Sequence, residues 1–205
     1  MATVIAYIDG FNLYHGLHER YRRHCLWLDL LGLVQRLRPR DEIITIKYFT
    51  ALVVNAPDAA DRQGIYLDAL RAYSGSTLEI VFGRFQGKAR SCRACGSSWT
   101  HYEEKETDVN IAVSLVADTA AEASDIALVI SADSDLCPAI RTARSLPVQR
   151  GMIAAFPPRR SSFEIRGLIP AAFTIGQDKL RKSLLPDRVT DPATGAVFKL
   201  PDHWY

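Results

Sequence analysis

Several features that define common classes of protein are missing from these 205 residues. No stretch approaches the run of about 20 apolar residues that a transmembrane helix needs, so we expect no contact with a membrane. The first residues, MATVIAYIDGFN, lack the basic region of a secretory signal peptide, and we therefore expect a cytoplasmic protein. The chain has only four cysteines, and without a secretory signal a framework of disulfides is not expected.

Familiar catalytic motifs are also absent. The five histidines show no HExxH spacing, and neither GxxxxGK[ST] nor GxGxxG occurs. No Ser-His-Asp or Cys-His set stands out. The segment DGFN lacks the second aspartate that a phosphoaspartyl hydrolase places two residues after its nucleophile. The sequence therefore carries no standard motif of a zinc peptidase, a P-loop NTPase or a dinucleotide-binding enzyme.

What is present is the composition of an ordinary globular protein, with 48% hydrophobic and 23% charged residues. The net charge of +2 does not by itself indicate nucleic acid. Basic residues nevertheless gather in the first forty positions and in the last third of the chain. Such runs form a solvated face about as often as a binding surface, so this pattern leaves both interpretations open.

Apolar runs alternate with helical patterns along the chain, which predicts a parallel sheet covered by helices on both faces. The predicted strands cover 3–8, 42–54, 78–85, 125–130, 152–156 and 172–175. We predict one α/β domain over residues 1–186. A small insertion at about 86–102 interrupts it as a loop or hairpin. Residues 187–205 are expected to form a loosely ordered C-terminal extension.

Carboxylates follow the predicted strands, and the active site of such a sheet lies at the carboxyl ends of its strands. The first strand ends at Asp9, and the fourth is followed by Asp133 and Asp135. A predicted helix starting near Glu104 carries this residue and Asp108 close to its N-terminus, where an acid could instead serve as a helix cap. Clustered carboxylates repel one another unless a cation neutralises them, and oxygen ligands without histidine suit Mg²⁺ or Mn²⁺. This arrangement is typical of phosphodiester hydrolysis.

Three blocks of the sequence, TVIAYIDGFNLYHGL, EKETDVNIAVSLV and ALVISADSDLCPAI, resemble those of NYN domains, the PIN-like metal-dependent ribonucleases. The later segments GMIAAFPPRRSSFEIRGLIPAAFTI and KLRKSLLP look like the end of that domain, so the resemblance covers most of residues 3–186. It implies a three-layer α/β/α sandwich with a mainly parallel sheet. It also implies an acidic cleft that binds Mg²⁺ or Mn²⁺, and RNA as substrate.

The resemblance carries roles over by position. The acids that match the metal-binding and catalytic positions of the family are Asp9, Asp108, Asp133 and Asp135. All four are present, so nothing indicates an inactive site.

Further positions match the family's substrate-binding side. Asn12 matches the asparagine that follows the first acid, and Lys105 matches a lysine that could neutralise a phosphate. Ser131 and Ser134 could hold a water or a phosphate oxygen. Ala132 stands where the family often has glycine, a departure that removes no ligand.

The insertion contains a lone CxxC pair, Cys92 and Cys95. A structural zinc site needs four ligands, so the pair could bind Zn²⁺ only with His101, a distant residue or a second subunit. A metal-free turn and a redox site are the other interpretations. Basic and aromatic residues of the insertion either contact single-stranded RNA or pack onto the domain. These residues are Lys88, Arg90, Arg93, Trp99 and Tyr102.

The sequence as a whole predicts a ribonuclease that depends on Mg²⁺ or Mn²⁺ and acts on RNA, expected to be single-stranded. The alternative is a regulatory protein that binds RNA or a partner protein with little or no catalysis. A DNA nuclease or a small phosphatase could use the same cleft, and the preference for RNA rests on the resemblance alone. A homodimer is a reasonable arrangement for one compact domain.

Overall fold

The computed structural model describes residues 1–148 and 150–204, so Gln149 and Tyr205, which fall within the predicted domain and its extension, lie outside the described residues. A six-stranded sheet runs through its centre in the order β3-β2-β1-β6-β7-β8, and all neighbouring strands in it are parallel. The predicted parallel α/β sheet is thereby confirmed. Its strands are β1 (Thr3–Asp9), β2 (Glu42–Thr50), β3 (Leu78–Phe82), β6 (Ile126–Ile130), β7 (Gly151–Phe156) and β8 (Ala172–Thr174).

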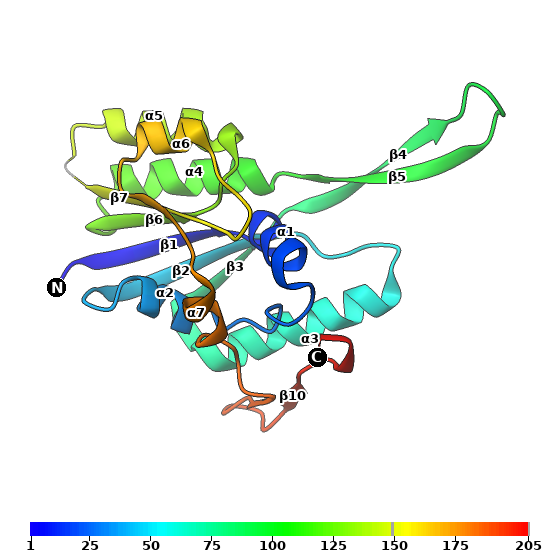
Figure 1. Ribbon diagram of the computed structural model, residues 1–205, viewed down its shortest axis with the longest axis horizontal. Coiled ribbons are helices and arrows are strands. Elements are labelled where there is room, and N and C mark those ends of the chain that lie inside the picture. The colour runs from blue at the N-terminus through cyan, green and yellow to red at the C-terminus, as the bar shows by residue number, and fades with distance from the viewer. Residues whose placement is uncertain (149, 205) are drawn as a thin grey trace.

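Helices cover both faces of this sheet, as Figure 1 shows. One layer consists of α4 (Thr107–Ala120), α5 (Cys137–Ser145) and α6 (Phe163–Leu168). The other layer consists of α1 (Gly10–Tyr21), α2 (Leu30–Leu37), α3 (Pro57–Ser74) and α7 (Gln177–Arg181). No helix in the described part of the chain is both long and apolar enough to span a bilayer.

The two layers explain why β1 reads as an unbroken apolar run. Side chains of a strand alternate between the faces of the sheet. Ile5 and Tyr7 enter the core beneath α4 and α5, whereas Val4, Ala6 and Ile8 enter the core beneath α1, α2 and α3. All five are buried, so neither face of β1 tolerates a polar side chain until the strand ends at its carboxyl edge.

The insertion forms a two-stranded antiparallel hairpin of β4 (Arg84–Ser91) and β5 (Ser98–Lys105), which projects away from the body of the molecule (Figure 1). The strand predicted over 78–85 therefore ends at Phe82, and a new strand begins after Gly83. Because β5 continues to Lys105, the helix predicted from Glu104 begins only at Thr107. Gly83 is needed at the base, where a Cβ atom would lie 2.6 Å from the carbonyl oxygen of Lys105.

The C-terminal segment was expected to be a loose extension, but its described residues, 187–204, contain regular secondary structure. Its short hairpin of β9 (Arg188–Thr190) and β10 (Val197–Lys199) packs against α3, and a 3₁₀ turn (Asp202–Trp204) follows. Val189 is only 2% exposed, and the Trp204 ring lies 5.8 Å from the Tyr66 ring. Isolated apolar residues such as these show no periodicity, which is why the sequence did not reveal the hairpin.

Candidate metal centre

Three carboxylates meet at the carboxyl edge of the sheet. Asp9 is the last residue of β1, and Asp133 follows the neighbouring strand β6. Asp108 lies in the first turn of α4, which packs across β1. Ligand oxygens of these three residues all lie within 4.8 Å of one another. The topology thus brings together three of the four acids that the sequence singled out, although they come from distant segments.

A hydrogen-bond network fixes the centre of this cluster. The Asp9 carboxylate is 3% exposed and accepts from the backbone N–H of Asn12 at 2.9 Å and from the Ser131 hydroxyl at 2.7 Å. The Ser131 oxygen in turn accepts from the N–H of Asp133 at 3.0 Å. The Asn12 side chain accepts from the N–H of Ala132 at 3.0 Å. Asn12 and Ser131 therefore tie the start of α1 to the loop after β6 and hold Asp9 in place.

Burial, together with the negative charges of neighbouring carboxylates, disfavours the ionised form of the acids in this cluster. Burial raises the pKa of Asp9, and the hydrogen bonds from Asn12 and Ser131 offset this only in part. Burial also raises the pKa of Asp108 to about 6, with further contributions from the charges of Asp9 and Asp133. None of the three carboxylates has an ion-pair partner within residues 1–148 and 150–204. Charge of one sign thus accumulates without a compensating side chain.

These properties fit a divalent cation. The ligand atoms are hard carboxylate oxygens, the donor set that Mg²⁺ and Mn²⁺ prefer. A cation would remove the repulsion that raises the pKa of Asp108. A hollow of about 180 Å³ lies over the cluster, and Glu104, His15 and Arg160 also line it. It leaves room for waters and a phosphate group beside the carboxylates.

Two of these lining residues differ from the prediction. Glu104 was predicted on a helix, and Arg160 was not predicted as a site residue. Glu104 lies on β5 rather than on a helix, and its carboxylate accepts from the N–H of Thr107 at 3.0 Å, which caps α4. Arg160 reaches the hollow from the loop after β7 and forms an ion pair with Glu19 of α1. The signal for Arg160 was its place after the carboxyl end of a predicted strand, the same rule that found Asp133.

Three predicted residues lie at the margin. The N–H of Asp135 donates to the Asp133 carboxylate at 3.0 Å, but the Asp135 side chain is exposed and stays outside the group of three. Ser134 is exposed in the same 3₁₀ turn. Lys105 ends β5 and forms an ion pair with Glu103 at 3.3 Å, so it does not line the hollow.

The CxxC pair lies at the tip of the projecting hairpin. The N–H of Cys92 donates to the carbonyl of Ser97, and Gly96 adopts a φ of +70°, which completes a tight turn. Hydrogen bonds from Ser97 and Cys92 lower the pKa of Cys95 to about 7. His101 pairs with Lys88 farther along the hairpin. Among the described residues no third ligand joins the two thiols, so zinc binding here stays a prediction.

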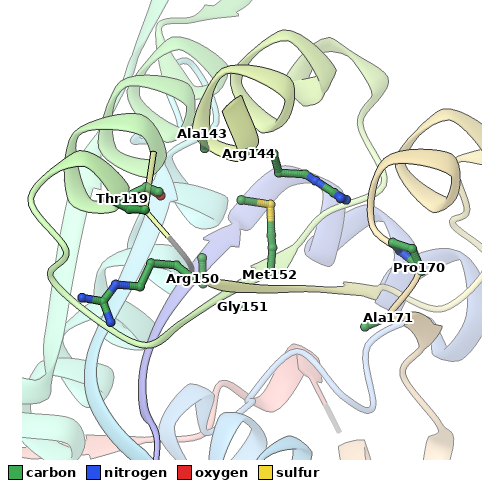
Figure 2. A pocket seen from close by; sticks show the side chains of 10 residues that line it. Thr119, Ala143, Arg144, Arg150, Gly151, Met152, Pro170 and Ala171 are labelled. Carbon is green, nitrogen blue, oxygen red and sulfur yellow. The ribbon is translucent and has the colours of Figure 1, made fainter. Parts of the chain in front are cut away.

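A larger hollow of about 580 Å³ lies at the opposite, amino end of β7. Figure 2 shows Met152 between the side chains of Arg144 and Arg150. Arg150 forms ion pairs with Glu122 at 2.6 Å and with Asp125 at 3.0 Å. The residues that line this larger hollow include no carboxylate or thiol. It therefore offers no metal ligands of the kind that the acidic cluster contains.

The chain is similar to known proteins and matches one family model. A family model of the NYN domain matches residues 3–166. The curated relative named 6-hydroxy-3-succinoylpyridine 3-monooxygenase HspA, from Pseudomonas putida (strain DSM 28022 / S16), is 29% identical over 180 residues, which cover 68% of this chain and 54% of the relative. The chain thus spans about half the length of the curated relative it matches.

A crystal structure of a protein of unknown function from Vibrio parahaemolyticus shares the fold, with a TM-score of 0.58 at 17% identity, and the match covers 90% of this chain and 96% of that one. NYN domains are typically nucleases, are generally dependent on a divalent metal, and have RNA as their suggested substrate. The family match extends over most of the chain and includes all three clustered aspartates. The chain therefore belongs to the NYN domain family.

Proposed function

We propose that this protein is a metal-dependent ribonuclease that hydrolyses phosphodiester bonds of RNA in the acidic hollow. The observation that carries the proposal is the convergence of three carboxylates within 4.8 Å in a member of a nuclease family. Asp9, Asp108 and Asp133 would hold Mg²⁺ or Mn²⁺. When bound, such a cation supplies a Lewis acid and lowers the pKa of a coordinated water.

The chain's own residues would orient the reacting groups. Ser131 and Asn12 hold the Asp9 carboxylate in one orientation, so little reorganisation is needed at the moment of reaction. Asp135, exposed at the rim, would orient the attacking water or accept its proton. Ser134 lies in the same turn and would donate to a phosphate oxygen. Arg160 would offset the charge of the scissile phosphate from the far wall of the hollow.

The projecting hairpin would guide the RNA strand toward the hollow. Trp99 is 52% exposed and Tyr102 is 40% exposed, which favours stacking on bases over packing onto the domain. Lys88 and Lys105 both pair with Glu103, at 2.5 Å and 3.3 Å, so each would have to exchange this partner for a phosphate. Single-stranded RNA fits this arrangement because its bases are free to stack on protein rings.

The test is cleavage of a pool of labelled single-stranded RNAs by the wild type, Asp9→Asn and the control Asp187→Asn. Asp187 is exposed and lies in the C-terminal segment, away from the hollow. With Mn²⁺ or Mg²⁺ we expect cleavage by the wild type and the control, and a loss of roughly 10³-fold in Asp9→Asn. EDTA should abolish all cleavage. Full activity in Asp9→Asn would contradict the proposal.

The regulatory alternative predicts a different outcome of the same experiment. A binding protein would retain the RNA equally well with Mn²⁺ and with EDTA, and would produce no fragments. A parallel assay with single-stranded DNA of the same sequences tests the RNA preference, and equal cleavage of both would favour a general nuclease.

A second candidate comes from the name of the curated relative, a 6-hydroxy-3-succinoylpyridine 3-monooxygenase. The observation that favours it is a pocket lined by aromatic rings beside the acidic hollow. Oxygen uptake with a reductant and 6-hydroxy-3-succinoylpyridine tests this candidate. Uptake that depends on the pyridine would support it, and the ribonuclease proposal predicts none.

A further inference from the structure

A second pocket, of about 310 Å³, adjoins the acidic hollow and shares Phe11 and His15 with it. It opens between α1, the end of β2, the first half of α3 and the 3₁₀ turn that contains Trp204. Its volume lies at the lower end of the range of about 300–1,000 Å³ for pockets that bind small molecules. The pocket is therefore large enough for one small molecule.

Five aromatic side chains are among the residues that line this pocket, Phe11, Tyr14, Tyr48, Tyr66 and Trp204. The Tyr48 ring packs on the backbone of Gly10, where a Cβ atom would lie 3.0 Å from the ring. Burial, and then the charge of Asp9, raise the pKa of Tyr48, which places this ring next to the cluster. On the other side, the Tyr66 and Trp204 rings meet edge to face at 5.8 Å. The pocket thus extends from Trp204 in the C-terminal turn to Tyr48, whose ring lies near Asp9.

The lining of this pocket also carries positive charge. Arg23 and Arg62 line it, and neither forms an ion pair within the residues that the structure describes. Desolvation, and then the charges of these two arginines, lower the pKa of His203, while Asp58 acts weakly in the opposite direction. No acidic side chain lines the pocket. Two guanidinium groups close to the same imidazole suit an anion such as a phosphate.

We propose that this pocket binds the base of the nucleotide next to the scissile phosphate, and that Arg23 and Arg62 bind the phosphate on the outer side of that nucleotide. The inference rests on the proposed function, since it makes the pocket part of the RNA site. Tyr14, which is 45% exposed and stacks on His18 at 5.7 Å, extends the aromatic surface outward. Stacking accepts any base, so the pocket selects unpaired nucleotides rather than a sequence.

The test measures binding of 5′-AMP and 5′-UMP to the full chain in EDTA by isothermal titration calorimetry. We expect saturable binding of both nucleotides, weakened at least about 10-fold when Arg23→Gln and Arg62→Gln are combined. Ala59 lines the pocket, so Ala59→Trp should fill it and abolish binding. The control is Arg40→Gln, an exposed arginine outside the pocket that should bind like the wild type. Circular dichroism checks that each variant is folded.

Further ligands test the base site and the phosphate site separately, and show whether free phosphate alone binds. Adenosine and inorganic phosphate should each bind more weakly than 5′-AMP, because each fills only one half of the site. The proposal is overturned by no saturable binding up to about 5 mM nucleotide. It is equally overturned by binding that both pocket variants leave unchanged, or by tighter binding of 6-hydroxynicotinate, an aromatic acid, than of either nucleotide.

Two separate measurements on the wild type distinguish this inference from the proposed function. Nucleotide binding is measured in EDTA, where catalysis plays no part, and RNA cleavage is measured with Mn²⁺. Nucleotide binding without RNA cleavage by the wild type would contradict the nuclease alone. RNA cleavage by a wild type that binds neither nucleotide would contradict the pocket alone.

Discussion

At the scale of single residues, Asp9 has two structural roles as well as its proposed chemical one. Its carboxylate caps α1 through the N–H of Asn12, and it accepts from Ser131 of the neighbouring strand end. Each oxygen thus already holds one donor and keeps a lone pair for a cation. The sequence predicted Asp9 and Asn12 as site residues, and the structure adds the hydrogen bond from the Asn12 N–H that fixes the Asp9 carboxylate.

Removal of the Ser131 hydroxyl should loosen the cluster. We expect Ser131→Ala to weaken Mn²⁺ binding by about 10- to 100-fold, because an outer partner of a ligand is lost. The free energy of unfolding should fall by about 1–3 kcal/mol, since the buried Asp9 oxygen loses its donor. Calorimetric titration and urea unfolding measure the two effects. Ser145→Ala, an exposed hydroxyl on α5, is the control, and equal behaviour of both variants would contradict the network.

Asp108 makes the stability of the metal-free protein depend on pH. Its pKa of about 6 in the folded protein exceeds the ordinary value of 3.8, so the folded state binds the proton more tightly than the unfolded state does. Stability is therefore lost as the pH rises from about 4 to about 6. In EDTA at pH 7 we expect Asp108→Asn to be more stable than the wild type by about 1 kcal/mol, after allowance for solvent screening.

Urea unfolding of both proteins between pH 4 and pH 7 measures this difference. The two stabilities should converge toward pH 4, where Asp108 is protonated in the folded protein. With Mn²⁺ at pH 7 the order should reverse, because the cation stabilises only the protein that binds it. A constant difference at all pH values would show that ionisation of the buried Asp108 carboxylate does not cause the difference in stability.

At the scale of elements, the predicted strands agree with the structure where both faces of a strand are buried, because such a strand has a continuous run of apolar residues. The runs ending at Asp9 and Ile130 gave β1 and β6 within a residue or two. The sequence left the insertion open as a loop or a hairpin, because most residues of β4 and β5 are exposed and no alternation of apolar and polar residues marks them as strands. The same lack of pattern moved the predicted start of α4 back to Glu104.

The hairpin should contribute to RNA binding rather than to stability. We expect Trp99→Ala to weaken binding of single-stranded RNA by about 1–3 kcal/mol, the usual contribution of one stacked base. Fluorescence anisotropy with the Asp9→Asn protein as background measures binding without cleavage. Thr100→Ala, the next exposed residue on the same strand, should bind normally. An unchanged affinity of Trp99→Ala for single-stranded RNA would show that Trp99 of the hairpin does not contribute to RNA binding.

At the scale of the whole molecule, the position of the acidic cluster follows from strand order. Residues 9, 108 and 133 meet because β1 and β6 are neighbours in the middle of the sheet and α4 crosses the same edge. The rule that sites form at the carboxyl ends of parallel strands pointed to Asp9 and Asp133, whereas Asp108 was singled out by its place near the start of a predicted helix. The pocket beside it was not predictable in the same way. Its walls come from α1, β2, α3 and the C-terminal turn, and no single segment carries a pattern for it.

The most direct test of the account is the rate of cleavage of one single-stranded RNA in Mn²⁺ by the wild type and by Asp133→Asn. Asp133 belongs to the cluster but caps only a short 3₁₀ turn, so its replacement should leave the fold intact. We predict metal-dependent cleavage by the wild type and a rate roughly 10³-fold lower in the variant, with circular dichroism spectra that show both proteins folded. Equal rates in the two proteins, or cleavage by the wild type that persists in EDTA, would contradict the account.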